Sequence, residues 1–166
     1  MKKAYKIMLI CLILAGLVCP GCKPSSNARV EENKALIRRV YEAMDKRDWT
    51  KFAEMHSTDF VYHTPDNPKP QTREELLQSV REMAASLPDW HTTIEDIIAE
   101  GDKVVTRETL RGTNTGEVSG NPPTGKELTL PLIHIFRIKD GKIAETWEMY
   151  NTMSVMQQLG IMPPEG

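Results

Sequence analysis

The chain has 166 residues, of which 40% are hydrophobic and 27% are charged, and this globular composition excludes a wholly disordered or collagen-like protein. Its formal net charge of −2 supplies no basic field, so no nucleic-acid partner is expected. The length suits one domain that can bury enough surface to fold without a disulfide or a metal.

The N-terminus has the pattern of an export signal. Three lysines among the first six residues precede an uncharged apolar run at 7–18, which is shorter than the roughly 20 residues of a membrane-spanning helix. Cys22 follows Gly21 after this run, as in a bacterial lipobox. Residues 1–21 are therefore predicted to be a signal peptide and Cys22 a lipidation site. Ordinary secretion and an uncleaved anchor are the alternatives.

These features predict an exported protein of the bacterial cell envelope, lipid-anchored on the periplasmic side or at the cell surface. A membrane is then contacted only through the signal peptide or the lipid. All three cysteines lie within the first 22 residues, so the folded part offers no disulfide, thiol nucleophile or Cys-ligated zinc. Residues 22–30 are predicted to be a tether, 31–161 the domain and 162–166 a tail.

Helical patterns dominate the first half of the domain. Apolar side chains recur at helical spacing over 31–47 and, more briefly, over 50–56. Thr72 and Glu75 form a capping box that opens a third helix, and Pro88 ends this helix. The first half is therefore predicted to contribute the helices.

Strand patterns dominate the second half. After a short strand at 60–63 and a Pro-rich loop at 64–71, the pattern predicts strands at 91–100, 102–112, 127–138 and 142–152 and a last helix at 154–159. Helices followed by an antiparallel meander predict an α+β fold, a curved antiparallel sheet with the N-terminal helices packed on one face. The pocket enclosed between them is the expected site.

His134 and Glu148 are polar residues on otherwise apolar strands. His134 shares a strand face with Leu132 and Phe136, so it is expected to be buried or to line a cavity. A carboxyl group in an apolar cavity has a raised pKa, which suits Glu148 to general acid/base chemistry near neutral pH. The four histidines lack metal-ligand spacing, and neither a metal nor a cofactor is expected.

The turn at 140–141 decides whether His134 and Glu148 share a face of the sheet, because a slip of one residue turns every side chain over. A two-residue turn places Glu148 on the opposite face from His134. A three-residue loop with Gly141 as a bulge places both on one face. The sequence fits both turns.

Further motifs lie in the second half of the chain: Gly112-Thr113, Gly116, Pro122–Lys126, His134, the Arg137–Trp147 hairpin and Gln158–Gly160. With the opening helix, His63–Pro65 and Leu87–Asp89, this set resembles the SnoaL-like polyketide cyclases, often called ester cyclases, of the nuclear-transport-factor-like superfamily. The resemblance covers 31–161 and implies an α+β barrel. It says less about activity, because the superfamily hosts cyclases, isomerases, hydrolases and non-enzymatic binders.

The resemblance implies an acid/base late in the sheet with a histidine on the neighbouring strand, and these roles fall on Glu148 and His134. It therefore favours the same-face register. Three positions depart from the family pattern: Glu148 is longer than the usual Asp, Asn151 replaces Asp and Asn114 replaces His. Sheets of the superfamily pack as dimers, so a homodimer is expected, with a patch on strands 91–112.

The predicted function is a small-molecule pocket protein, a cofactor-independent cyclase or isomerase. Glu148 would move a proton at the carbon next to a carbonyl while His134 stabilises the enolate. Four further residues are predicted to contact the substrate: His63, Trp90, Arg107 and Trp147. The alternatives are core positions for the two tryptophans and a salt bridge from Arg107 to Glu95 or Glu108.

Two other functions remain open from the sequence. One is a non-catalytic envelope lipoprotein that binds an apolar small molecule, and the other is a dimeric domain in an envelope assembly. The volume and the polar lining of the pocket discriminate among the enzyme and these two alternatives. A cavity of several hundred Å³ with a buried, unpaired acid favours an enzyme, a cavity without the acid favours a binder, and a filled interior favours assembly.

Overall fold

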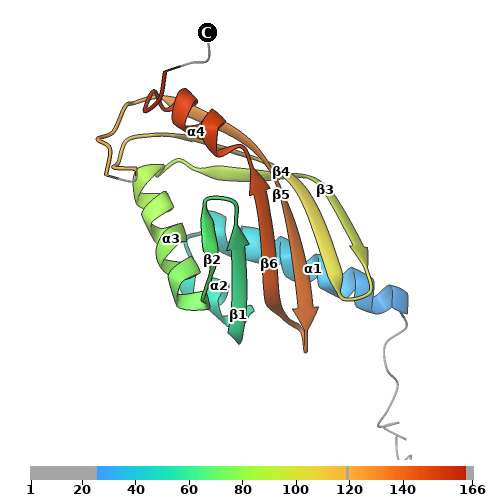
Figure 1. The fold of residues 1–166 in the computed structure, drawn as a ribbon. Helices are drawn as coiled ribbons and strands as arrows, with labels where there is room; N and C mark the ends of the chain where they lie inside the picture. The colour runs from blue at the N-terminus through green and yellow to red at the C-terminus, as the bar shows by residue number, and fades with distance from the viewer. Residues whose placement is uncertain (1–25, 119, 164–166) are drawn as a thin grey trace, which may run out of the picture.

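The computed structural model describes residues 26–118 and 120–163 (Figure 1). The predicted signal peptide, the lipidation site Cys22 and residues 22–25 of the predicted tether lie outside the described residues. Residues 26–30, also predicted as tether, instead begin the first helix. No helix among the described residues is long and apolar enough to cross a membrane.

Four helices are described, and each lies close to its predicted position. They are α1 (Ser26–Asp45), α2 (Trp49–Glu54), α3 (Arg73–Ser86) and α4 (Thr152–Gln158). The predicted capping box of α3 is confirmed: the Thr72 hydroxyl accepts from the Glu75 N–H at 3.3 Å, and the Thr72 N–H donates to Glu75 Oε2 at 2.7 Å. This exchange satisfies two backbone donors at the helix start.

Six strands form one curved sheet. They are β1 (His56–Thr64), β2 (Asn67–Gln71), β3 (His91–Glu100), β4 (Lys103–Thr113), β5 (Glu127–Lys139) and β6 (Lys142–Tyr150), in the order β2-β1-β6-β5-β4-β3. The antiparallel meander predicted for β3 to β6 is confirmed. The α+β class is therefore as expected, but the sheet is mixed rather than wholly antiparallel, because β1 runs parallel to β6.

The segment predicted as a Pro-rich loop contains the strand β2. Within the described part of the chain β2 pairs only with β1 and forms an edge of the sheet. An edge strand has one side without ladder hydrogen bonds, so Pro68 and Pro70 are tolerated there although they lack an N–H. The prediction of a loop over 64–71 is therefore wrong for Asn67–Gln71, because prolines do not exclude an edge strand.

The β5–β6 hairpin has neither of the two predicted registers. Lys139 pairs with Lys142 across a two-residue turn in which Asp140 and Gly141 have φ of 52° and 73°. The register then shifts by one residue at Ala144, a bulge on β6. The bulge offsets the two-residue turn, and His134 lies directly opposite Glu148.

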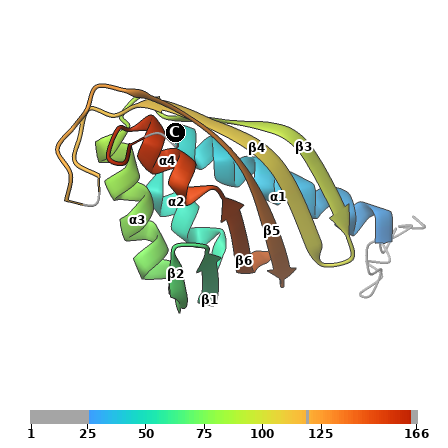
Figure 2. The same cartoon turned by 45° about the horizontal axis from the view of Figure 1, so that its top comes forward.

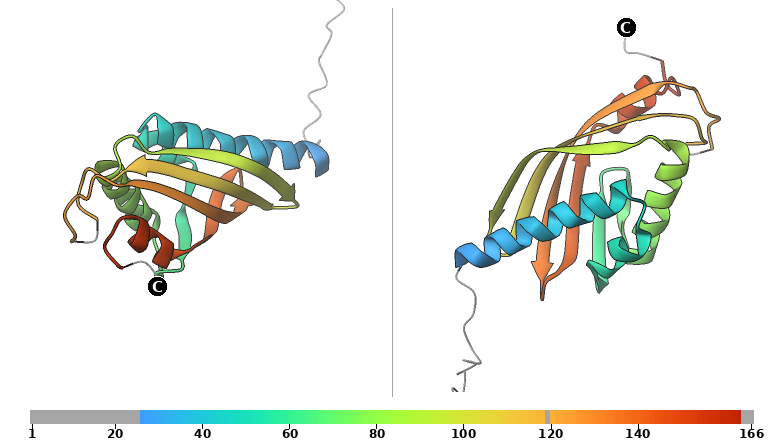
Figure 3. Two further views of the ribbon diagram at one scale, coloured as in Figure 1. Left: turned by 90° about the horizontal axis from the view of Figure 1, so that it is seen from above. Right: turned by 180° about the vertical axis from the view of Figure 1, so that it is seen from behind.

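Helices α1, α2 and α3 pack on the inward face of the sheet. Figure 2 shows β4 and β5 curving over α2 and α3, and Figure 3 shows α1 running across the strands. Alternate side chains of β4 and β5, including Val104, Leu110, Leu132 and Phe136, are buried against these helices. The inward face therefore forms the core, and the pocket lies within it.

Candidate functional site

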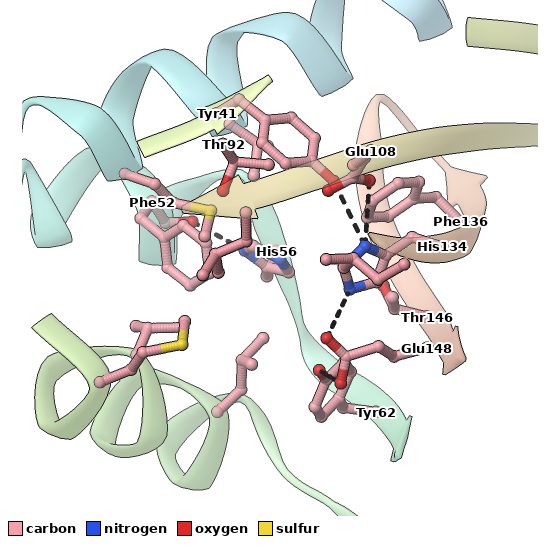
Figure 4. Close-up of a pocket in the computed structure, with 17 residues that line it drawn as sticks. Tyr41, Phe52, His56, Tyr62, Thr92, Glu108, His134, Phe136, Thr146 and Glu148 are labelled. Atoms are coloured by element: carbon pink, nitrogen blue, oxygen red, sulfur yellow. Dashed lines mark hydrogen bonds and ion pairs between the residues drawn. The ribbon is translucent and has the colours of Figure 1, made fainter. Parts of the chain in front are cut away.

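A cavity of about 80 Å³ lies between the sheet and helices α1 to α3 (Figure 4). Its apolar lining comes from all three helices and from the strands: Val40, Met44, Phe52, Leu76, Val80, Met83, Leu110, Leu132 and Phe136. Its polar lining is Tyr41, His56, Tyr62, Thr92, Glu108, His134, Thr146 and Glu148. No lysine or arginine lines this cavity among the described residues.

His134 is held between two carboxylates. Its Nδ1 lies 3.1 Å from Glu108 Oε1 on β4, and its Nε2 lies 3.3 Å from Glu148 Oε1 on β6. The β5–β6 register brings Glu148 opposite His134, and the β4–β5 register places Glu108 two residues along β4 from Thr106, the partner of His134. Three adjacent strands thus supply the three groups.

This arrangement keeps His134 in its charged form. Burial by itself lowers the pKa of a histidine, but the hydrogen bonds and charges of Glu108 and Glu148 outweigh burial and raise the pKa of His134 to about 10. Burial by itself would raise the pKa of Glu108, but the hydrogen bond and charge of His134 lower it. Near neutral pH the site therefore contains an imidazolium that donates from both ring nitrogens.

Glu108 is the most deeply buried member of the site, with 1% of the residue exposed. Its Oε1 accepts hydrogen bonds from the hydroxyls of Tyr41 and Thr106 as well as from His134. Its Oε2 is buried and has no hydrogen-bond partner among the described residues. One carboxylate oxygen is therefore crowded with donors while the other has none.

Glu148 has a second partner in Tyr62 of β1, whose hydroxyl donates to Glu148 Oε2 at 2.6 Å. Burial and the nearby carboxylates raise the pKa of both Tyr62 and Tyr41, so both hydroxyls stay protonated donors. Glu148 is thus not the unpaired acid that the sequence interpretation required. A substrate would have to displace His134 or Tyr62, or to use a remaining lone pair of Glu148.

His56, which was not selected from the sequence, also lines the cavity. Its Nδ1 lies 2.7 Å from the carbonyl oxygen of Phe52, so Nδ1 carries the proton because a carbonyl only accepts. Burial lowers the pKa of His56 to about 4, which leaves the ring neutral near pH 7. The two histidines of the cavity therefore differ in charge.

The four residues predicted to contact substrate do not line the cavity. His63 stacks on Trp147 at 5.3 Å between ring centroids, and its Nε2 pairs with Glu145 at 2.9 Å. Trp90 is buried in the core, as its alternative interpretation expected, and its indole N–H donates to Thr92 at 2.9 Å. Arg107 pairs with Asp96 at 2.7 Å, and not with Glu95 or Glu108.

Two departures from the family pattern have structural roles. Asn151 caps α4, because its Oδ1 accepts from the Ser154 N–H at 3.0 Å. Asn114 is buried and accepts from the Thr124 N–H at 2.8 Å while donating to the Gly116 carbonyl at 2.7 Å. These two asparagines hold loops and do not line the cavity.

Sequence reasoning missed Glu108 as a member of the site. The available signal was its period of two on β4, where Val104, Thr106 and Leu110 share its inward face. Tyr41 gave no such signal, because an aromatic residue on the apolar stripe of a helix is normally a core residue. Among the described residues, no group of three or more His, Cys, Asp or Glu is arranged to hold a metal ion.

A curved sheet whose open face is closed by helices over an apolar cavity with a polar centre defines an α+β pocket protein. The sequence profile of the SnoaL-like polyketide cyclases matches residues 34–159, and the chain belongs to this family. The predicted family is thereby confirmed.

Three relatives illustrate the similarity. AclR of Streptomyces galilaeus, a proposed hydroxylase, is 28% identical with a TM-score of 0.74 over 82% of this chain and 86% of its own. IdmH of Streptomyces antibioticus, a proposed polyketide cyclase, is 32% identical with a TM-score of 0.69 over 77% of this chain and 98% of its own. Sordarin/hypoxysordarin biosynthesis cluster protein G of Sordaria araneosa is 26% identical over 121 residues, 69% of this chain and 77% of its own.

Proposed function

We propose that this protein catalyses a cofactor-independent proton transfer at the carbon next to a carbonyl group, as in a cyclisation or isomerisation. Glu148 is the general base and then the general acid. The observation that carries the proposal is the direct pairing of Glu148 with a charged His134, mostly shielded from solvent, inside an apolar cavity. The relationship to IdmH, a proposed polyketide cyclase, supports the same reaction class.

The surrounding residues suit the charge that develops in such a reaction. When Glu148 takes a proton from carbon, negative charge moves to the carbonyl oxygen of the substrate. The imidazolium of His134 and the hydroxyl of Tyr62 both already donate to Glu148, so each is within reach of an oxygen bound beside that carboxylate. Protonation makes Glu148 a weaker acceptor, so these donors can turn from Glu148 to the enolate oxygen as the negative charge moves there.

The cavity limits the size of the substrate. Its volume of about 80 Å³ is below the roughly 300–1,000 Å³ of typical ligand pockets. It is also below the several hundred Å³ that the sequence interpretation set for an enzyme. The substrate we propose is therefore a small or slender carbonyl compound. The predicted export and lipid attachment would place this pocket in the cell envelope.

Deuterium exchange tests the proposal without knowledge of the natural substrate. Full-length protein is incubated in D₂O with cyclopentanone or acetylacetone, and loss of the α-proton signals is followed by NMR. Glu148→Gln keeps the shape and an acceptor oxygen but cannot take up the proton. We expect it to lower the protein-dependent exchange rate by about 10²–10⁴-fold.

Glu95→Gln is the matched control, because Glu95 is an exposed carboxylate on β3 that accepts from Thr109 and does not line the cavity. It should exchange at the wild-type rate. Binding of both ketones with equal exchange by wild type and Glu148→Gln would contradict the proposal. The non-catalytic small-molecule binder, which uses the same pocket, would then be the better assignment.

A further inference from the structure

The hydrogen-bond donors around the cavity are nearly all used within the protein. The hydroxyls of Tyr41 and Tyr62 donate to Glu108 and Glu148, and both ring nitrogens of His134 face these same carboxylates. Two neutral hydroxyl groups of the lining can still donate a hydrogen bond. The Thr92 hydroxyl accepts from Trp90, so its own proton is unused, and the Thr146 hydroxyl has no partner among the described residues.

Acceptors, in contrast, are left over. Glu108 Oε2 and Thr146 Oγ1 are buried without a partner among the described residues, and both residues line the cavity. The Nδ1 proton of His56 is given to Phe52, so His56 Nε2 is a bare lone pair, and the described residues supply no donor to it. Figure 4 shows His56 and His134 on separate parts of the cavity wall. Buried polar atoms normally have partners, so Glu108 Oε2, which can only accept, calls for a donor from outside the chain, and His56 Nε2 offers a second acceptor in the same cavity.

The charge of the cavity points the same way. Two carboxylates and one imidazolium leave one net negative charge, and the cationic side chains lysine and arginine are absent from the described lining. An apolar wall strengthens the repulsion of a second anion, because charges interact more strongly where water is excluded. A carboxylate or phosphate ligand would add an unpaired negative charge at considerable cost.

We propose that the pocket selects ligands that carry a hydrogen-bond donor without negative charge, an ammonium or a hydroxyl group, on a small apolar skeleton, and that Glu108 sets this selectivity through its unpartnered oxygen. This inference deepens the proposed function, because it names the ligand class of the same pocket. The donor group binds at Glu108, separately from the carbonyl group that reacts beside Glu148.

Three probes with one carbon skeleton test the selectivity: isobutylamine, isobutanol and isobutyrate. They are titrated at pH 7 into full-length protein labelled with ¹³C at histidine Cε1. The four histidines divide into two reporters in the cavity, His56 and His134, and two outside it, His63 and His91. Each titration therefore contains its own control for surface binding.

We expect isobutylamine and isobutanol to shift the His56 and His134 signals, and isobutyrate to bind at least about tenfold more weakly than isobutylamine, because a charge-assisted bond is replaced by repulsion. Isobutyrate binding as tightly as isobutylamine would overturn the proposal. Shifts confined to His63 and His91 would do so as well.

Glu108→Gln then tests the residue. This substitution keeps the shape of the side chain while replacing its charge by a neutral amide, so isobutylamine should lose about tenfold in affinity and isobutyrate should gain. Glu95→Gln should leave the wild-type ranking intact. If Glu108→Gln does not fold, the wild-type ranking still decides on the ligand class. These titrations and the deuterium-exchange experiment can fail independently. If the three probes do not follow the expected order of affinity, exchange that depends on Glu148 would still support the proposed function.

Discussion

His134 is fixed at both ring nitrogens by carboxylates from the two strands beside it. In this clamp, formed by Glu108, His134 and Glu148, the two carboxylates have different roles. Glu108 is almost wholly enclosed and accepts three hydrogen bonds on one oxygen, whereas Glu148 keeps 16% of its side chain exposed. Glu148 is therefore the carboxylate that can accept a proton from a substrate, and Glu108 keeps His134 charged.

The clamp predicts how stability depends on pH. An unfolded histidine has a pKa near 6.5, and the folded-state pKa of His134 is raised to about 10. The contribution of His134 to the free energy of unfolding is therefore fully present below about pH 6.5 and is lost as pH rises toward 10. Tyr41 and Tyr62 do not titrate in this window, because their pKa values are raised above the ordinary value of 10.

We expect the free energy of unfolding, measured in urea, to fall between about pH 6.5 and 10 in the wild type. His134→Gln should remove most of this slope. His91→Gln, which removes a largely exposed histidine beside Asp45, should keep it. Equal slopes in the wild type and His134→Gln would show that the imidazolium is not held by the two carboxylates.

Among the elements, the β5–β6 hairpin decides the composition of the site. Its turn is the two-residue type, which alone would place Glu148 on the outer face. The bulge at Ala144 adds one residue to β6 and restores Glu148 to the face of His134. The bulge lies where β1 also changes register against β6, between His56 and Val61. Pairing with a strand far away in the chain accompanies this local irregularity.

The start of α3 is an element whose stability can be measured directly. Thr72→Ala removes the hydroxyl that accepts from Glu75, and we expect a loss of about 0.5–2 kcal/mol in the free energy of unfolding. Ser79→Ala removes another exposed hydroxyl of the same helix, one that bonds only the Glu75 carbonyl, and should be nearly neutral. Equal costs for the two variants would contradict the capping role.

For the whole molecule, the outward face of the sheet presents an apolar row that crosses four strands. Ile98 pairs with Val105, Val105 with Ile135, and Ile135 with Trp147. Ile133 and Met149 form a second exposed pair beside this row, 44% and 62% exposed. The patch expected on strands 91–112 therefore extends over β5 and β6.

We expect a homodimer that packs through this face, since an exposed apolar surface of several strands is costly to leave in water. Light scattering at micromolar concentration should give twice the chain mass for the wild type. Met149→Glu should shift it toward the monomer, and Met153→Glu on α4, also exposed, should not. A wild-type protein of monomer mass would reject the dimer.

The sequence by itself determined the helices and the meander, because these depend on local periodicity, capping and turn residues. It also determined the family, because the family motifs each lie within one segment of the chain. It also selected His134 and Glu148, since a polar residue between apolar neighbours on a strand is visible in one segment. The leader, the lipidation of Cys22 and the location in the envelope stay predictions from the sequence.

Only the tertiary structure decided what completes the site. Glu108 and Tyr41 reach His134 from β4 and α1, and no local pattern relates residues 67 positions apart. The bulge at Ala144 and the parallel pairing of β1 with β6 join distant segments in the same way. His63, Trp90, Arg107 and Trp147 looked suitable by residue type, but strand parity and core packing placed them outside the cavity, because side-chain direction is set by register and not by chemistry.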